Sequence, residues 1–450
     1  MVLCKNIYFT KVFPSDKIRI IKNDLEGSRM NMAIASLIAL ALSIVLGFVR
    51  KLNVGIVAIA LAYIIGIAYG LSAKDITGGF SSSMAMTMIG VMYLFAIVSK
   101  NGTLELLAKK ITGLARGNRY LLYVAIYVIG IILSGVGPGA IPTLAIVPVL
   151  AIPVALKAGM NPILLSLIGQ MGAQCVRMCP ITPEAVVVRD LMVEQGLDGN
   201  TLPAMWSLWA TEIVMIIAAF IFFKGWKFDK PLESVELEET DHFSPKQILT
   251  LIGLLAMIAG VVVFGFDVGL TSLVIGTILL VCGCADEKVV IKSIPWNTIL
   301  MVLGVGVLMN IVSLSGGVEL LAGSISNVSS ASTISPMMCL VASVMSFFAS
   351  GLGVVFPTLV PTVGSIAAEF GGAISPIELM ASVVIGGTVA GFTPISTAGA
   401  LIQAGVSQFP EVENKYSQNK MFVELFIIAF LSTFISVAMA VLGVYGVICG

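Results

Sequence analysis

Charged residues are scarce in this 450-residue chain. Asp, Glu, Lys and Arg make up 11% of it, whereas about 25% is usual in soluble globular proteins. The hydrophobic share is 58%, and so few charges could not cover the surface of a soluble protein of this size. The composition therefore excludes a soluble enzyme, a disordered protein and a nucleic-acid binder, and it indicates a protein embedded in a lipid bilayer.

Residues that hold metals or perform catalysis are scarce as well. The single histidine, His242, lies in a polar stretch, and the seven cysteines are scattered without a zinc-type spacing. The phosphate-binding pattern G-x-x-x-x-G-K-[ST] is missing, so the chain is not itself an ATPase. We therefore expect no enzymatic activity, no resident cofactor and no structural metal.

Long apolar stretches are abundant. Eight windows are close to the roughly 20 residues that a membrane-spanning helix needs. They are residues 32–49, 53–72, 80–99, 205–223, 246–265, 268–284, 296–315 and 421–449. Two further apolar regions, 120–195 and 334–408, are interrupted by Gly and Pro. Residues 1–29 are basic and contain no span, so we interpret them as a short tail or as sequence before a true start at Met30 or Met32.

The chain repeats itself at an offset of 214 residues. Four motifs recur in order at that spacing. They are Asn53-Val54-Gly55 with Asp267-Val268-Gly269, Gly102–Ala108 with Gly316–Ala322, Asn161-Pro162-Ile163 with Ser375-Pro376-Ile377, and Pro180-Ile181-Thr182 with Pro394-Ile395-Ser396. Chance does not explain four ordered matches at one offset. The sequence predicts two transmembrane repeats, 30–225 and 244–450, joined by an acidic cytoplasmic linker at 226–243.

The distribution of basic residues predicts that the second repeat is inverted. The stretch 100–119 carries five Lys and Arg residues, whereas no Lys or Arg occurs between Ser293 and Asn414. Because basic loops stay in the cytoplasm, 100–119 should be cytoplasmic and its counterpart 314–333 external. We therefore expect an all-α polytopic membrane protein of about 5+5 transmembrane helices, with two re-entrant hairpins and two broken helices. The basic residues of 1–29 conflict with an external N-terminus unless translation starts at Met30.

Four Gly- and Pro-rich breaks interrupt the apolar regions, two in each repeat. The hairpin tips lie at Ser134–Thr143 and Ser350–Thr358, and the broken helices at Arg177–Glu184 and Gly391–Thr397. Irregular backbone at membrane depth is tolerated only inside protein or beside a water-filled cavity. In transporters such breaks expose helix termini that bind ions and substrates. Kinks in packed helices are the alternative, but four symmetric breaks favour a binding site.

Arg177 is the most informative single residue. It lies in an apolar stretch beside a break, and its repeat counterpart is Gly391. A buried membrane charge is functional by default, and a guanidinium suits a carboxylate. A structural ion pair with Glu184 is the alternative. Gln170 and Gln174 would line the same cavity or pack against a neighbouring helix, and Glu212 would couple transport or bond a neighbouring helix.

These features resemble a known superfamily. The pattern Tyr93-Leu94-Phe95-Ala96-Ile97 followed by Asn101-Gly102-Thr103, the paired hairpins and Pro-rich breaks, and Ile294-Pro295-Trp296-Asn297-Thr298 resemble the ion transporter superfamily. Within it the first segment is most similar to MatC-type dicarboxylate (malonate) carriers, and more distantly to divalent anion/sodium symporters. The resemblance implies an elevator transporter, usually a homodimer. Of the symporters' Ser-Asn-Thr hairpin motif only Ser134 and Ser350 are retained, each followed by glycine.

The sequence thus predicts a secondary active transporter in the bacterial inner membrane that takes a small organic anion, a dicarboxylate in particular, with sodium or protons. The expected substrate-binding residues are Ser134, Gly137, Thr143, Arg177, Thr182, Ser350, Gly353, Thr358, Ser396 and Thr397. The expected ion-coupling residues are Gly135, Gly139, Gly351, Thr393 and Glu184. A cation/proton antiporter of the same superfamily and a membrane subunit of a larger uptake complex are the alternatives.

Overall fold

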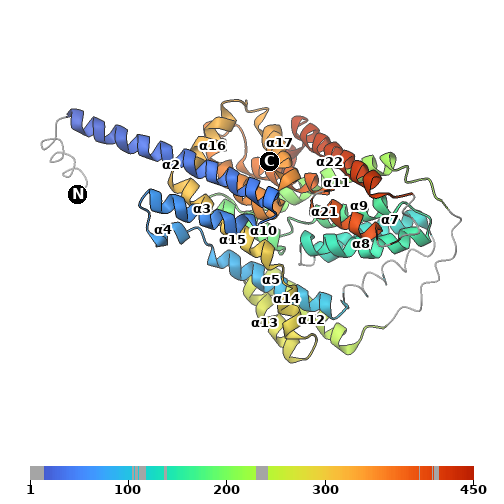
Figure 1. Cartoon of the computed structure of the whole chain (residues 1–450). Coiled ribbons are helices and arrows are strands. Elements are labelled where there is room, and N and C mark those ends of the chain that lie inside the picture. The colour runs from blue at the N-terminus through green and yellow to red at the C-terminus, as the bar shows by residue number, and fades with distance from the viewer. Residues whose placement is uncertain are drawn as a thin grey trace.

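The computed structural model is all-helical over the residues that it describes: 15–103, 106, 110, 118–135, 139–229, 242–394, 396–407, 409 and 415–450. Seven helices in this part of the chain are long and apolar enough to cross a membrane. The molecule is therefore a multi-pass membrane protein (Figure 1). Most of the expected linker 226–243, and Gly137 of the first hairpin tip, lie outside the described residues.

The two halves of the chain contain similar series of helices. The first series is α2 (Ser15–Arg50), α3 (Val54–Ala68), α4 (Ala73–Thr77), α5 (Ser82–Lys100), α7 (Arg119–Gly135), α8 (Ala140–Lys157), α9 (Pro162–Cys175), α10 (Pro183–Val193) and α11 (Leu202–Phe222). The second is α12 (Pro245–Phe264), α13 (Val268–Val281), α14 (Glu287–Ser293), α15 (Trp296–Leu314), α16 (Gly317–Ser326), α17 (Ile334–Phe348), the π-helix η1 (Gly351–Val355), α18 (Phe356–Leu359), the 3-10 helix η2 (Val360–Thr362), α19 (Val363–Glu369), α20 (Pro376–Val389), the 3-10 helix η3 (Ala390–Phe392), α21 (Thr397–Val406), α22 (Gln418–Val441) and α23 (Val444–Cys449).

Two of the repeated motifs are helix N-caps. The side chain of Asn53 accepts hydrogen bonds from the first backbone N–H groups of α3, and that of Asp267 does the same for α13. Asn161 caps α9 and Ser375 caps α20, each followed by proline at the first helical position. These residue types are the preferred caps, and proline suits that position because its missing N–H would have no partner there. The motifs recur because each starts a helix.

Helices from the two halves cross closely. Helix α3 packs against α15, and α5 packs against α13. A Cβ added to Gly55 would lie 2.2 Å from the Leu300 carbonyl oxygen, and one added to Gly90 would lie 2.1 Å from that of Gly269. Small residues allow such close backbone contact in membrane proteins. Both crossings therefore depend on glycine.

Replacing Gly90 with alanine should destabilise the protein, because the new methyl group meets backbone and forces α5 and α13 apart. Overpacking of this kind typically costs about 1–3 kcal/mol. Thermal unfolding of the purified protein in detergent measures the effect. Gly260→Ala in α12 is the matched control, because its Cβ would meet only side-chain atoms at 3.4 Å. Equal melting temperatures for the two variants would show that the crossing tolerates a wider separation.

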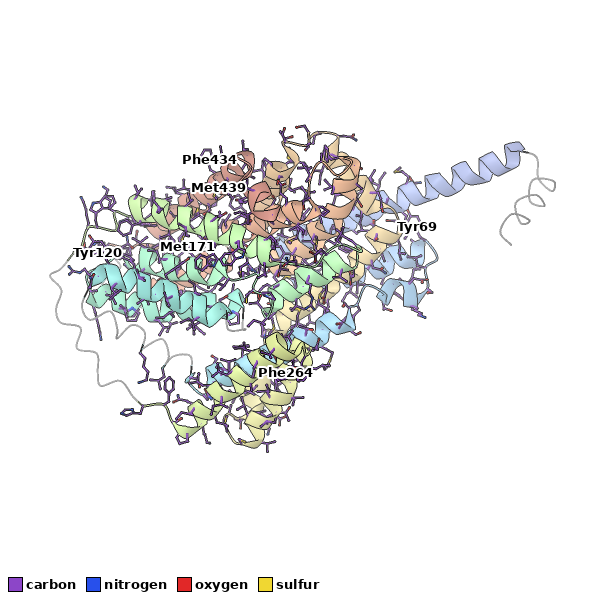
Figure 2. All side chains as sticks on the ribbon, turned by 180° about the vertical axis from the view of Figure 1, so that it is seen from behind. Tyr69, Tyr120, Met171, Phe264, Phe434 and Met439 are labelled. Carbon is purple, nitrogen blue, oxygen red and sulfur yellow. The ribbon has the colours of Figure 1, made fainter. Side chains whose placement is uncertain are left out.

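The helices gather into several groups (Figure 1). Helices α5, α12, α13 and α14 lie together at one end, while α7, α8, α9 and α21 form another group. Large apolar side chains cover much of the outer surface, with Phe434 71% exposed and Phe264 68% exposed, whereas Met171 is fully buried (Figure 2). An apolar exterior of this kind suits contact with lipid tails.

Two helix boundaries differ from the sequence-based expectation. The expected final span 421–449 is divided into α22 and α23, because Gly443 adopts a left-handed conformation with φ of 72° and ends the helix. At the other end of the chain, α2 begins at Ser15, so helical backbone extends into the segment expected to be a tail.

Candidate functional site

The first hairpin turns at a glycine. Helix α7 ends at Gly135, and Gly139 precedes α8 with φ of 78° and ψ of −175°. Only glycine adopts this conformation readily. The Thr143 hydroxyl donates to the Gly139 carbonyl oxygen at 3.0 Å. The N-terminus of α8 is buried, since Ala140 is fully buried, so its first N–H groups need partners from outside the helix.

The first broken helix is interrupted between Cys175 and Pro183. Thr182 caps α10, accepting a hydrogen bond from the Ala185 N–H at 3.3 Å. Its hydroxyl also lies 2.7 Å from the Arg177 carbonyl oxygen, to which it donates. The cap thus fixes the interrupted segment that carries Arg177.

Arg177 is buried, with 5% of its surface exposed. Its guanidinium donates from Nη1 to Gln174 Oε1 at 3.2 Å and lies 3.5 Å from Thr388 Oγ1. Its Cζ also lies 5.3 Å from the ring centroid of Phe356, a cation–π distance. Thr388 and Phe356 belong to the second half of the chain, so both halves build the surroundings of this cation.

Glu184 occupies the N-terminus of α8. Its Oε1 accepts hydrogen bonds from the backbone N–H groups of Ala140, at 2.9 Å, and Ile141, at 3.4 Å. The same oxygen lies 3.9 Å from Arg177 Nε. The ion pair with Glu184, one of the two sequence-based interpretations of Arg177, is therefore present. Gly139 is required here, because its Cβ would lie 2.0 Å from Glu184 Oε2.

Several buried polar atoms in these breaks have no hydrogen-bond partner. They are Ser134 Oγ, Gln170 Oε1, Arg177 Nε, Glu184 Oε2, Thr358 Oγ1 and Thr393 Oγ1. An unsatisfied buried polar atom costs about 1–3 kcal/mol, and natural proteins contain few of them. At least one of these atoms lies at each of the four breaks, which is typical of places where a polar ligand or ions bind.

The second hairpin has a different form from the first. Helix α17 ends at Phe348, and the π-helix η1 follows directly from Gly351. Ser350 Oγ caps η1 by accepting from the Gly353 N–H at 3.1 Å. A Cβ on Gly351 would lie 2.5 Å from the Gly387 carbonyl oxygen. π-Helical segments are rare and are found frequently at functional sites.

The second broken helix passes from α20 through η3 to α21, which begins at Thr397. Thr393 is fully buried in this break, and the Ser396 N–H donates to its carbonyl oxygen at 3.0 Å. The Gln170 side chain links α8 and α21, which follow the first hairpin tip and the second broken helix. Its Nε2 donates to Leu144 O of α8 and, at 3.2 Å, to Ala398 O of α21.

The structure brings together only part of the predicted set. Arg177, Glu184 and Gly139 meet at the tip of the first hairpin. The hydroxyls of Thr143, Thr182 and Ser350 bond local backbone. Gly135 lies against Val176, and Gly353 lies against Met301 of α15 instead of the arginine.

Phe356 and Thr388 lie beside Arg177 and were not identified from the sequence. Thr388 could have been found, because it stands 214 residues after Gln174 and so occupies the equivalent position in the second half. Gln174 and Thr388 accept from the same guanidinium nitrogen, Nη1 of Arg177.

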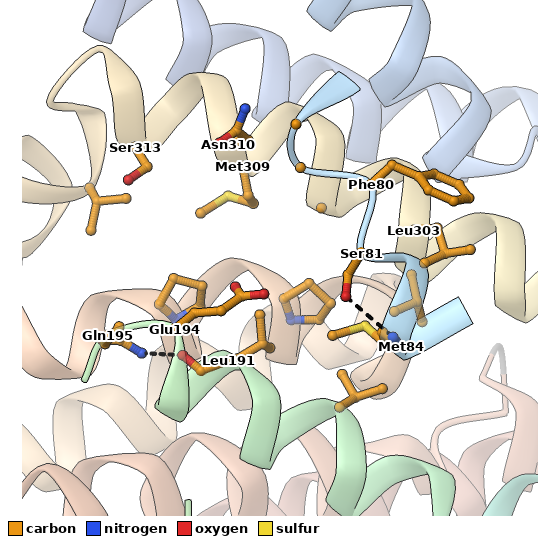
Figure 3. A pocket seen from close by; sticks show the side chains of 18 of the residues that line it. Phe80, Ser81, Met84, Leu191, Glu194, Gln195, Leu303, Met309, Asn310 and Ser313 are labelled. Atoms are coloured by element: carbon orange, nitrogen blue, oxygen red, sulfur yellow. Dashed lines mark hydrogen bonds between the residues drawn. The ribbon is translucent and has the colours of Figure 1, made fainter. Parts of the chain in front are cut away.

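A cavity of about 850 Å³ lies between α10, α15 and the second hairpin. Its walls come from both halves, with Met309 and Asn310 of α15 on one side and Leu191, Glu194 and Gln195 on the other (Figure 3). Pro357, next to Phe356, also lines it. Arg177, Glu184, Gln174, Thr388 and Phe356 themselves do not line this cavity.

Apolar helices interrupted by buried polar breaks are features that membrane transporters share. Residues 30–176 match the family model described as the dicarboxylate carrier protein MatC N-terminus, which confirms the resemblance noted in the sequence. A search of curated proteins finds no match. The crystal structure of the YdaH transporter from Alcanivorax borkumensis is similar over 93% of this chain and 98% of that chain, with a TM-score of 0.56 and 12% sequence identity. At that identity the likeness concerns the fold.

Proposed function

We propose that the protein is a secondary active transporter of a small carboxylate anion, a dicarboxylate in particular, driven by sodium or protons. The observation that carries the proposal is Arg177, a buried guanidinium at a helix break with an unpartnered Nε. A guanidinium binds carboxylates through charge-assisted hydrogen bonds. The match of residues 30–176 to a dicarboxylate carrier model agrees with that chemistry.

Other groups at the breaks would suit a second carboxylate group. Ser134, Thr358 and Thr393, at three of the four breaks, have buried hydroxyls without hydrogen-bond partners, and the N-terminus of α8 attracts negative charge through its N–H groups and dipole. These donors come from both halves, so an anion bound between them would hold the halves together. Unwound backbone carbonyls at the same breaks would suit a sodium ion.

We also propose an inverted-repeat, elevator-type architecture. The pairing of α3 with α15 and of α13 with α5 supports it, because Gly55 and Gly269, like Gly90 and Gly304, stand 214 residues apart. The hairpins and broken helices would move against these pairs, within a homodimer in a bacterial inner membrane. The cavity bounded by α15 and α10 lies where the two parts would slide.

The inverted topology makes a labelling prediction. In a cysteine-free background, cysteine at Lys110 should react with a membrane-impermeant maleimide only after cells are opened, whereas cysteine at Ser324 should react in intact cells. The reason is the positive charge of 100–119 and the absence of Lys and Arg from 314–333. Reaction of both positions from the same side would contradict an inverted second repeat.

Uptake into proteoliposomes tests the proposed function. Labelled malonate and succinate are supplied with an inward sodium gradient, an inward proton gradient or neither. We expect saturable uptake of at least one acid that is accelerated by one gradient. Absence of saturable carboxylate uptake under either gradient would refute the proposal.

A cation/proton antiporter is the second candidate, favoured by the buried carboxylates of Glu184 and Glu212. It would be indicated by proton flux on addition of sodium without any carboxylate. Uptake that is retained by the protein purified alone would exclude a role as a subunit of a larger complex.

A further inference from the structure

We propose that Glu184 occupies the substrate carboxylate position when the site is empty, and that it takes up a proton when the substrate displaces it. The inference rests on the proposed function and deepens it, because it names the coupling ion and the residue that carries it. The carboxylate of Glu184 would act as an internal anion that each transport cycle must move aside.

The contacts of Glu184 are those that a bound carboxylate would make. Its Oε1 accepts from the first N–H groups of α8, at Ala140 and Ile141, and faces Arg177 Nε at 3.9 Å. A helix N-terminus and a guanidinium together form an anion-binding site. Glu184 is 1% exposed, so the anion-binding site that it occupies lies in the protein interior.

The pairing is incomplete, which makes it replaceable. Glu184 Oε2 has no hydrogen-bond partner, and neither does Arg177 Nε. A separation of 3.9 Å is too long for a hydrogen bond. A substrate carboxylate that bonded the guanidinium directly would satisfy donors that Glu184 leaves free.

The buried charges require a cation to enter with the anion. Within the described residues the buried charged side chains are Arg177, Glu184 and Glu212, one cation against two carboxylates. Adding a dianion to this set without a counter-charge would place four negative charges against one positive charge. Isolated charges in a low-dielectric interior cost far more than protonation, so displacement favours the neutral form of Glu184.

The proton balance is simple. A proton from the aqueous side from which the substrate enters binds a Glu184 oxygen, and the neutral carboxyl group leaves Arg177 and the α8 N–H groups. The substrate carboxylate then takes those donors. When the substrate dissociates on the other side, Glu184 releases the proton and returns to α8, so one proton crosses with each anion.

Few other titratable groups face Glu184. Arg177 is the charged side chain whose field reaches it. Helices α18 and η2 pack against α10 without a titratable side chain, and α5 carries Tyr93, directed towards Gly276 of α13, and Lys100 in its last turn. On α10 itself, Arg189 and Asp190 pair with each other at 3.0 Å.

Calorimetric binding of succinate in buffers of different ionisation enthalpy tests the proposal between pH 6.5 and 8.5. We expect the native protein to take up about one proton per succinate bound, and its dissociation constant to rise about tenfold per pH unit. In Glu184→Gln succinate should bind without proton uptake and with an affinity independent of pH. Glu287→Gln, which changes an exposed carboxylate in the first turn of α14 away from the cavity, is the control and should behave as the native protein.

The outcomes separate this inference from the proposed function. Binding by the native protein without proton uptake would overturn the role of Glu184 and leave carboxylate transport standing, whereas absence of binding of any dicarboxylate would overturn the proposed function. Proton uptake that persists in Glu184→Gln, or that disappears in Glu212→Gln instead, would also overturn the assignment. If Glu184→Gln fails to fold, the native protein and Glu212→Gln still test the proposal, because absence of proton uptake in either would overturn it.

Discussion

Arg177→Ala abolishes carboxylate uptake while the protein still reaches the membrane. The substitution removes the buried cation and leaves Glu184 without its ionic partner. Truncation of one partner of a buried, hydrogen-bonded charge pair costs about 2–5 kcal/mol of binding free energy, which corresponds to a loss of at least about 30-fold in substrate affinity. Uptake of labelled dicarboxylate into proteoliposomes measures the loss, at matched protein content.

Arg177→Lys is the matched control for this variant. Lysine keeps the positive charge but lacks the planar fork that can donate to both oxygens of a carboxylate. We expect it to retain part of the binding and to raise KM more than it lowers kcat. Normal uptake kinetics in Arg177→Ala would assign the arginine a purely structural role.

Gly139→Ala should disable the first hairpin. Its backbone conformation is one that residues with a side chain avoid, and the added Cβ would lie 2.0 Å from Glu184 Oε2. Either effect moves the Glu184 carboxylate away from the N-terminus of α8 far enough to break the hydrogen bonds between them. We expect a loss of uptake of tenfold or more and a lower melting temperature.

Gly265→Ala separates the two effects in Gly139→Ala. Gly265 also has a positive φ, of 67°, but its Cβ would meet nothing within 4 Å. The control should therefore lose a little stability and keep its uptake. If Gly139→Ala transports at the native rate, the contact between α8 and Glu184 has no part in transport.

The regular features of the fold could be predicted from the sequence. Apolar windows located most of the helices, and the Gly- and Pro-rich segments located the four interruptions, since those residues act through the local backbone. The N-cap motifs at Asn161 and Ser375 marked helix starts for the same reason. Local chemistry is sufficient for such features.

The composition of the Arg177 cluster could be predicted only in part. Arg177 and Glu184 stand out in an apolar stretch, but Phe356 and Thr388 are ordinary residues that reach the guanidinium through packing of the two halves. The π-helix η1 after Ser350 was not expected either, because the sequence of the second hairpin resembles that of the first. Long-range packing decides both features.

Equilibrium binding of labelled malonate and succinate to the purified protein tests the central claim most directly. We predict one saturable carboxylate site per chain in the native protein, and none in Arg177→Ala preparations whose melting profile shows that they are folded. Equal binding by the two proteins, or no binding by the native protein, would contradict the account of a carboxylate site at Arg177.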